Sequence, residues 1–163
     1  MSYVLPVANL AHLSSHFGPK KQSGSYFNTD QFESPQDIIA YINQNKPQEV
    51  FLQSNGREAH VFELAENKIV GYQGLANINA LGNTKIETEW RNGFEVRFAR
   101  VKSLLPSSRF CVIVEKNNAE NIVITMFPGI YAPPFPYKEQ SEVDYNNCEL
   151  FWNNYVLLKV DVN

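Results

Sequence analysis

The chain has 163 residues, of which 44% are hydrophobic and 19% are charged, and its formal net charge is −3. This length and composition are typical of an ordinary globular domain and exclude an intrinsically disordered chain. No apolar run reaches the roughly 18 residues that a membrane-spanning helix needs, and no secretory signal is recognisable at the N-terminus. We therefore expect no membrane partner, and a protein that is cytoplasmic or exported by a route that needs no signal peptide.

The charge and the cysteines narrow the range of partners. A pI of about 5.6 gives no overall positive field, so no DNA specificity is evident and any contact with RNA must use a local patch. The chain has two cysteines, Cys111 and Cys148, and Cys111 stands in an apolar strand pattern. This usage predicts buried thiols rather than a disulfide framework and is compatible with a reducing compartment.

The first 46 residues carry two helix patterns. Residues 6–17 have an apolar stripe at helical spacing, and Gly18-Pro19 ends it. The second helix is clearer, because Ser34-Pro35 is a typical helix start and Lys46-Pro47 stops the pattern.

From residue 49 the hydrophobic period changes to two. Asn55-Gly56 and Asn92-Gly93 each stand between two strand patterns and predict tight hairpins. Residues 110–115 are apolar on both faces, which predicts a central strand, and 122–127 follow it after a turn. Alternating apolar residues predict a last strand over 155–162.

This order of elements indicates the α+β class, with two N-terminal helices followed by a largely antiparallel, twisted β-sheet. We expect one domain over 1–163. Its helical part spans about 1–46, its sheet part spans about 49–136, and a C-terminal segment with the last strand spans 137–163. Antiparallel sheets commonly leave one face open, and we expect a site on that face or at its rim.

The three histidines allow different chemistry. His12 and His16 are four residues apart and share a helix face, but no third ligand follows at a metal-binding distance, so we expect no metal. Two interpretations stay open for this pair, namely solvated helix histidines or an acid–base group. His60 alternates with Phe62 and Leu64, and we interpret it as a satisfied, half-buried strand histidine rather than a catalytic one.

Basic residues occur in two stretches. Lys20 and Lys21 stand in a loop with small hydroxyl residues such as Ser25, and this segment does not match a Walker motif. Two interpretations stay open, namely a solvated loop or a loop that binds a phosphodiester. The second stretch extends from Arg91 to Arg109. It is either a set of solvated or ion-paired surface residues or a patch at the rim of the sheet. Its members are Arg91, Arg97, Arg100, Lys102 and Arg109.

The end of the 122–127 strand combines a polar residue with a rigid loop. Thr125 is predicted to face the same side as Val123 and Phe127, either as a satisfied core threonine or as a hydroxyl aimed at a site. Residues 127–137 contain four prolines, one glycine and several aromatic residues, which predicts a stiff loop suited to be a wall or a contact surface. No Gly-x-Ser-x-Gly or activated cysteine indicates a nucleophilic triad.

The order of these features resembles the small metal-independent RNase toxin domains of the barnase, EndoU, colicin and RelE-like group. The matching features are His16, Lys20-Lys21, Ser25-x-Phe27, a helix over 34–45, Asn55-Gly56-Arg57 and Ile124-Thr125 before an aromatic-Pro pair. The resemblance covers about 12–128. It does not account for the insert at 71–82, the extension at 127–137 or the acidic C-terminal tail.

The resemblance implies catalytic roles for four residues. His16 would be the acid or base that acts on the ribose 2′-OH, and Lys21 would neutralise the scissile phosphate. Arg57 would stabilise the charge that develops on the phosphate, and Thr125 would hydrogen-bond a phosphate oxygen. Binding residues would be Lys20, Ser25, Arg97 and Tyr131, with the Tyr131 ring stacking on a base.

The first functional hypothesis is therefore an endoribonuclease that leaves a 2′,3′-cyclic phosphate, uses no cofactor, and has RNA and a cognate inhibitor protein as partners. The alternative is a non-enzymatic immunity or adaptor domain that uses the Pro/aromatic loop 127–137 as its contact surface. A small-molecule pocket under the sheet is a third hypothesis, because strand-rich domains carry many unrelated activities.

Overall fold

The computed structural model describes residues 2–18 and 24–161. The chain divides into two compact units. Unit 1 comprises Met1–Lys20, Ser25–Gln73 and Pro106–Tyr131, and unit 2 comprises Lys21–Gly24, Gly74–Leu105 and Ala132–Asn163. The expectation of one domain over 1–163 stays a prediction.

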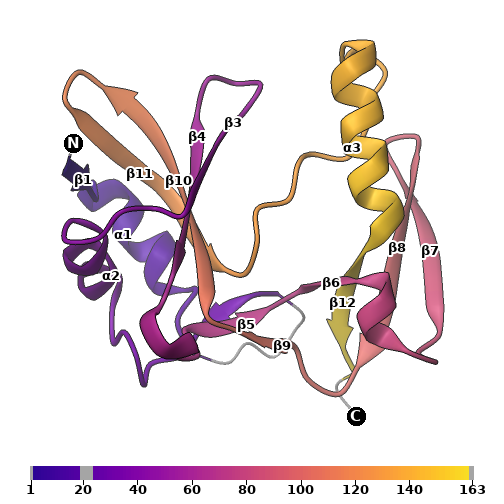
Figure 1. The fold of residues 1–163 in the computed structure, drawn as a ribbon, viewed down its shortest axis with the longest axis horizontal. Helices are drawn as coiled ribbons and strands as arrows, with labels where there is room; N and C mark the ends of the chain where they lie inside the picture. Colours follow the sequence, from indigo (N-terminus) through magenta and orange to yellow (C-terminus); the bar gives the residue numbers. More distant parts are fainter. Residues whose placement is uncertain (1, 19–23, 162–163) are drawn as a thin grey trace. The chain divides into compact units, whose positions relative to one another are not determined.

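Unit 1 is built on a five-stranded sheet in the order β1–β11–β10–β4–β3 (Figure 1). Its strands are β1 (Ser2–Val4), β3 (Glu49–Leu52), β4 (Glu58–Glu63), β10 (Arg109–Asn117) and β11 (Glu120–Pro128). β1 pairs with β11 in parallel, and the other neighbours pair antiparallel. The predicted Asn55-Gly56 hairpin is confirmed as the connection of β3 to β4, and the Gly56 N–H donates to the Gln53 carbonyl at 3.0 Å.

Two helices cover one face of this sheet, α1 (Val7–Ser14) and α2 (Pro35–Ile42). They bury Leu13, Ile38 and Ile42 against side chains of β4, β10 and β11. The sheet side of this core consists of Tyr3, Phe62, Phe110, Val112, Val114, Val123 and Met126. The opposite face carries a smaller cluster around Ala59, Val61, Cys111 and Ile113.

A β-bulge changes the faces of β11. Ile113 stands opposite Thr125, but Val114 stands opposite Val123, so Ile124 is the extra residue. Val123 therefore joins Met126 in the helix-covered core, and Thr125 lies on the other face with Phe127. The prediction that Thr125 and Val123 share a face is wrong, because strict alternation fails at a bulge.

A small sheet has the order β2–β5–β9, with β2 (Tyr26–Phe27), β5 (Gly71–Gln73) and β9 (Leu105–Ser107). Gly71 lies where β5 passes β2 and the end of β11. A Cβ on Gly71 would meet the Tyr26 carbonyl oxygen and stand 2.6 Å from Pro128 Cγ. Two 3₁₀ turns, Ala65–Asn67 and Ile78–Leu81, connect neighbouring elements.

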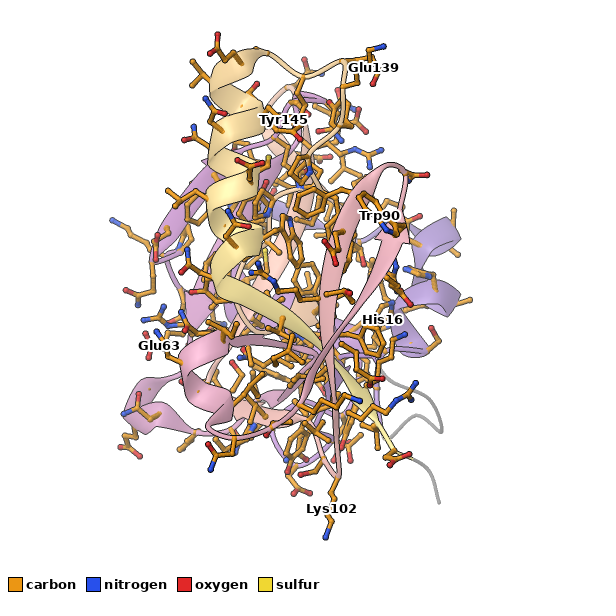
Figure 2. The ribbon with its side chains drawn as sticks, turned by 90° about the vertical axis from the view of Figure 1, so that its right-hand side faces the viewer. His16, Glu63, Trp90, Lys102, Glu139 and Tyr145 are labelled. Atoms are coloured by element: carbon orange, nitrogen blue, oxygen red, sulfur yellow. The ribbon has the colours of Figure 1, made fainter. Side chains whose placement is uncertain are left out.

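Unit 2 has a four-stranded sheet in the order β6–β12–β8–β7. Its strands are β6 (Leu75–Asn77), β7 (Ile86–Arg91), β8 (Phe94–Val101) and β12 (Tyr155–Val160), and helix α3 spans Glu142–Asn154. The predicted Asn92-Gly93 hairpin is confirmed, with φ of 52° and 84° at these two residues. Trp90 lies close to the tip of this hairpin and is exposed (Figure 2).

The predicted fold class is wrong. The described residues form twelve strands in three sheets and three short helices, so the protein is mostly β (Figure 1). The helices do not simply precede the strands, because β1 comes before α1, β2 separates α1 from α2, and α3 follows β11. Short strands such as β1 and β2 show no alternation, and α3 buries only Cys148 and Trp152. Among the described residues, no helix has the length and apolarity to span a bilayer.

We expect Gly71→Ala to lower the free energy of unfolding by about 3 kcal/mol, because its methyl group has no room between β2 and Pro128. Gly56→Ala is the matched control. Gly56 has a φ of 86° and no atom near its Cβ position, so alanine at this position adds only backbone strain, about 1 kcal/mol. Urea unfolding followed by circular dichroism measures both. Equal losses would contradict the close packing at Gly71.

Candidate functional site

The structure places His16 directly after α1, on the helix-covered side of unit 1. Its Nε2 lies 3.2 Å from His12 Nε2, and its carbonyl accepts the Phe27 N–H at 2.7 Å. His12 is exposed and His16 is half-buried. Among residues 2–18 and 24–161, no cluster of three histidine, cysteine or acidic side chains is suited to hold a metal ion.

Two of the other predicted catalytic residues, Arg57 and Thr125, lie on other elements of unit 1. Arg57 follows the β3–β4 turn, where its N–H donates to Asn55 Oδ1 at 3.0 Å. Thr125 lies opposite Ile113 on the sheet face that the helices do not cover. Lys21 is outside the described residues. The sheet therefore separates His16 from Thr125, and the described members of the set are not gathered into one cleft.

The described members of the predicted binding set belong to both units. Lys20 is outside the described residues, and Ser25 is half-buried just before β2. Arg97 belongs to unit 2, where its Nη1 donates to the Asn153 carbonyl at 2.7 Å. Ribonuclease activity stays a prediction.

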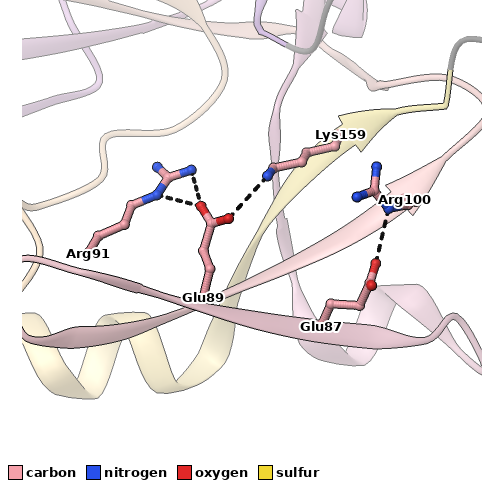
Figure 3. A network of polar contacts seen from close by, with 5 residues as sticks. All are labelled: Glu87, Glu89, Arg91, Arg100 and Lys159. Carbon is pink, nitrogen blue, oxygen red and sulfur yellow. Dashed lines mark hydrogen bonds and ion pairs between the residues drawn. The ribbon is translucent and has the colours of Figure 1, made fainter.

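Three members of the second basic stretch are ion-paired. In unit 2, Glu89 contacts both Arg91 and Lys159, and Arg100 Nε lies 3.2 Å from Glu87 Oε2 (Figure 3). The hydrogen bond from Arg91 lowers the pKa of Glu89. In unit 1, Arg109 pairs with Glu63 at 3.3 Å. These contacts agree with the ion-paired interpretation of this stretch.

Tyr131 makes a contact with an edge strand. Its ring stacks on Phe51 of β3 with centroids 5.0 Å apart and planes at 19°. β3 is the last strand of the five-stranded sheet, and all four of its residues are exposed. The exposed fractions are 50% for Val50 and 75% for Leu52. An apolar edge strand thus lies beside the first part of the Pro/aromatic loop.

The second part of that loop, residues 132–137, belongs to unit 2 and packs on α3. Trp152 Nε1 donates to the carbonyls of Pro133 and Pro134 at 3.1 and 3.2 Å, and the Phe135 ring lies 4.4 Å from the Trp152 ring. Pro136 is buried. These residues are held by contacts within unit 2, and within unit 1 the loop contacts the edge strand through Tyr131.

A polar network connects three strands of unit 1, and no sequence pattern predicts it as a group. His60 is 6% exposed, its Nδ1 lies 2.5 Å from the Tyr3 hydroxyl, and its Nε2 lies 2.9 Å from Glu58 Oε1. A carboxylate only accepts, so Nε2 carries the proton and Nδ1 accepts from Tyr3. Lys116 Nζ lies 3.4 Å from Glu58 Oε2. The prediction of a satisfied strand histidine is confirmed for His60.

This network shifts two pKa values. The hydrogen bond from His60 lowers the pKa of Glu58, with Lys116 adding to the effect and partial burial opposing it. Burial, and then the charge of Glu58, raises the pKa of Tyr3 to about 12. At neutral pH the network therefore holds an ionised carboxylate at one end and a protonated phenol at the other.

The comparisons with known proteins bear on the fold alone. No protein-family model and no curated protein matches the chain. The chain is similar to the crystal structure of a conserved hypothetical protein from Toxoplasma gondii ME49, with a TM-score of 0.55 and 8% identity. The match covers 94% of this chain and 93% of that one. At this identity it indicates a shared fold and nothing about activity.

We expect Glu58→Gln to lower the free energy of unfolding at pH 7 by about 1 kcal/mol, because it removes the charge that His60 and Lys116 contact. The pKa of Glu58 is lowered in the folded state, so this stabilisation is present above the ordinary carboxyl pKa. It is lost as pH falls through the folded value. Urea unfolding at pH 7 and in acid measures the difference, with Glu33→Gln on the surface as control. A difference that does not shrink in acid would contradict the ion pair.

The raised pKa of Tyr3 makes folding stability depend on pH in the alkaline range as well. The unfolded chain loses this proton near pH 10 and the folded chain near 12, so folding stability falls as pH rises between these values. We expect Tyr3→Phe to weaken this fall and to remove the last tyrosinate ionisation from the ultraviolet titration. The same alkaline profile in both proteins would show that another group is responsible.

Proposed function

We propose that this protein is a non-enzymatic protein-interaction domain that binds an extended segment of a partner protein along the free edge of β3. The observation that carries the proposal is the exposed apolar edge formed by Val50, Phe51 and Leu52 next to Tyr131. Natural sheets usually protect an edge with charges, proline, a bulge or a cover. β3 has a single charged residue, Glu49, and Pro47 stands outside the strand.

The backbone register supports strand addition. The Gln53 N–H donates to the Arg57 carbonyl at 2.8 Å, so the hydrogen-bonded pairs of this antiparallel ladder fall on odd-numbered residues of β3. The N–H and carbonyl groups of Val50 and Leu52 consequently point away from β4. An extended peptide can pair with them without disturbing the sheet.

The side chains specify the kind of segment. Phe51 and Tyr131 form an aromatic surface on one face of the edge, and Val50 and Leu52 lie on the other. A bound strand places successive side chains on alternate faces, so the partner segment is apolar at its centre on both faces. Four residues offer much less area than the roughly 800 Å² per partner of a stable dimer, which favours a captured peptide over a second copy of this chain.

The test places a photo-crosslinking phenylalanine analogue at position 52 in the native host, with position 150 as the control. Leu52 and Leu150 are both exposed, at 75% and 65%. We expect one adduct with a different protein from position 52 and none from position 150. In the purified complex, the amides of Val50 and Leu52 gain protection from hydrogen exchange.

A backbone variant separates strand pairing from simple apolar contact. Val50→Pro removes an outward N–H and should abolish the adduct, whereas Val50→Thr keeps the N–H and the branched shape and should retain it. If Val50→Pro does not fold, Leu52→Lys takes its place. This variant, without the crosslinking residue, is added as a competitor and should not reduce the adduct, whereas the unsubstituted protein should reduce it. An adduct with a second copy of the chain, or a partner that leaves the β3 amides unprotected, would overturn the proposal.

A further inference from the structure

A pocket of about 570 Å³ opens beside the Tyr3–His60 network in unit 1. Its walls come from β1, the chain just after α2, the β3–β4 pair, and the β10–β11 pair near its hairpin, all of which belong to unit 1. The volume is in the range of sites for small molecules. The network residues described above form part of this wall, and they reach it from positions far apart in the sequence.

The rim of the pocket is fixed by paired hydrogen bonds. Asn43 follows α2, its Oδ1 accepts the Tyr3 N–H at 2.8 Å, and its Nδ2 donates to the Tyr3 carbonyl at 3.2 Å. Tyr3 also donates its hydroxyl to His60. Both the backbone and the ring of Tyr3 are therefore held in place, which lowers the ordering cost of binding a ligand here.

The charges of the lining favour an anion. Lys46 and Lys116 bring two ammonium groups, and Glu58 brings the single carboxylate. That carboxylate already receives hydrogen bonds from His60 and Lys116, which satisfies much of its charge. Lys46 is exposed at the rim, and the Lys116 side chain is half-exposed. Lys46 can therefore turn toward a bound phosphate or carboxylate group, and the Lys116 ammonium, which has three N–H donors, can donate to it while it stays beside Glu58.

Asn121 gives a second and independent indication. The residue lines the pocket, is 3% exposed, and its buried Oδ1 has no hydrogen-bond partner within the described part of the chain. A buried acceptor without a donor costs about 1–3 kcal/mol. The deficit is relieved by a group that donates hydrogen bonds, such as a hydroxyl.

We propose that this pocket binds a small anion that also carries hydroxyl groups, of the sugar-phosphate class, with the acidic group on Lys46 and Lys116 and a hydroxyl on Asn121. The phosphate oxygens accept from the ammonium groups, and the hydroxyl donates to the amide oxygen. The inference does not depend on the proposed protein interaction, because it uses the polar pocket and not the free backbone edge of β3.

The test is isothermal titration of the full chain with ribose 5-phosphate, and with ribose and inorganic phosphate separately. We expect saturable binding of ribose 5-phosphate, and weaker or undetectable binding of the two fragments. Gluconate, which has a carboxylate in place of the phosphate, distinguishes the two kinds of acidic group. Absence of saturable binding for both ribose 5-phosphate and gluconate at millimolar concentration would overturn the inference.

Variants assign the two halves of the ligand. Lys116→Met should weaken ribose 5-phosphate binding about tenfold or more, and Lys68→Met, on an exposed lysine outside the pocket, should leave it unchanged. Equal affinities for these two variants would overturn the anion assignment.

Asn121→Leu isolates the hydroxyl contact. It should abolish the preference for ribose 5-phosphate over inorganic phosphate, and it should not lower the thermal stability of the free protein, since no donor is left behind. A preserved preference, or a large loss of stability, would show that Asn121 has a structural role instead.

Discussion

The burial of β10 on both of its faces is the constraint on which unit 1 depends. Residues 110–114 are all buried, with Phe110, Val112 and Val114 toward the helices and Cys111 and Ile113 toward the other face. Burial raises the pKa of the Cys111 thiol to about 12. A strand that is apolar on both sides needs cover on both sides and a partner at each edge. β4 and β11 fill the two edges, and the alternation of β10 decides which face of each neighbour is covered.

The polar network is a consequence of this register. His60 lies opposite Val112 and Glu58 lies opposite Val114, on the face that β10 turns toward the helices. Lys116 is two residues beyond Val114 and reaches Glu58 from the same side. The polar residues therefore begin where the apolar core of β10 ends. A shift of one residue would turn His60 to the other face and separate it from Tyr3.

Local patterns in the sequence predict the elements whose formation depends on residues close to one another in the chain. The two Asn-Gly hairpins, the central strand and the helical character of segments near α1 and α2 are of this kind. The fold class cannot be predicted in this way, because strands such as β1, with three residues, are defined by pairing with a distant strand, here in parallel with β11. The network is likewise invisible locally, since Tyr3 and His60 are 57 residues apart. The bulge at Ile124 shows the same limit, because one inserted residue reverses the face of Val123 relative to Thr125.

The position of β3 connects the two surfaces of unit 1. Val50 belongs to the free edge and also lines the pocket, because it lies opposite His60 on β4. A strand added to β3 would therefore run along one rim of the pocket, and its side chains on the Val50 face would stand beside the opening. The buried network keeps this rim in place. Replacing a buried polar network with apolar residues is often neutral or stabilising, so stability alone does not explain why a carboxylate, an imidazole and a phenol meet here. The proposed anion pocket gives these groups a role, because it needs fixed polar groups in its wall.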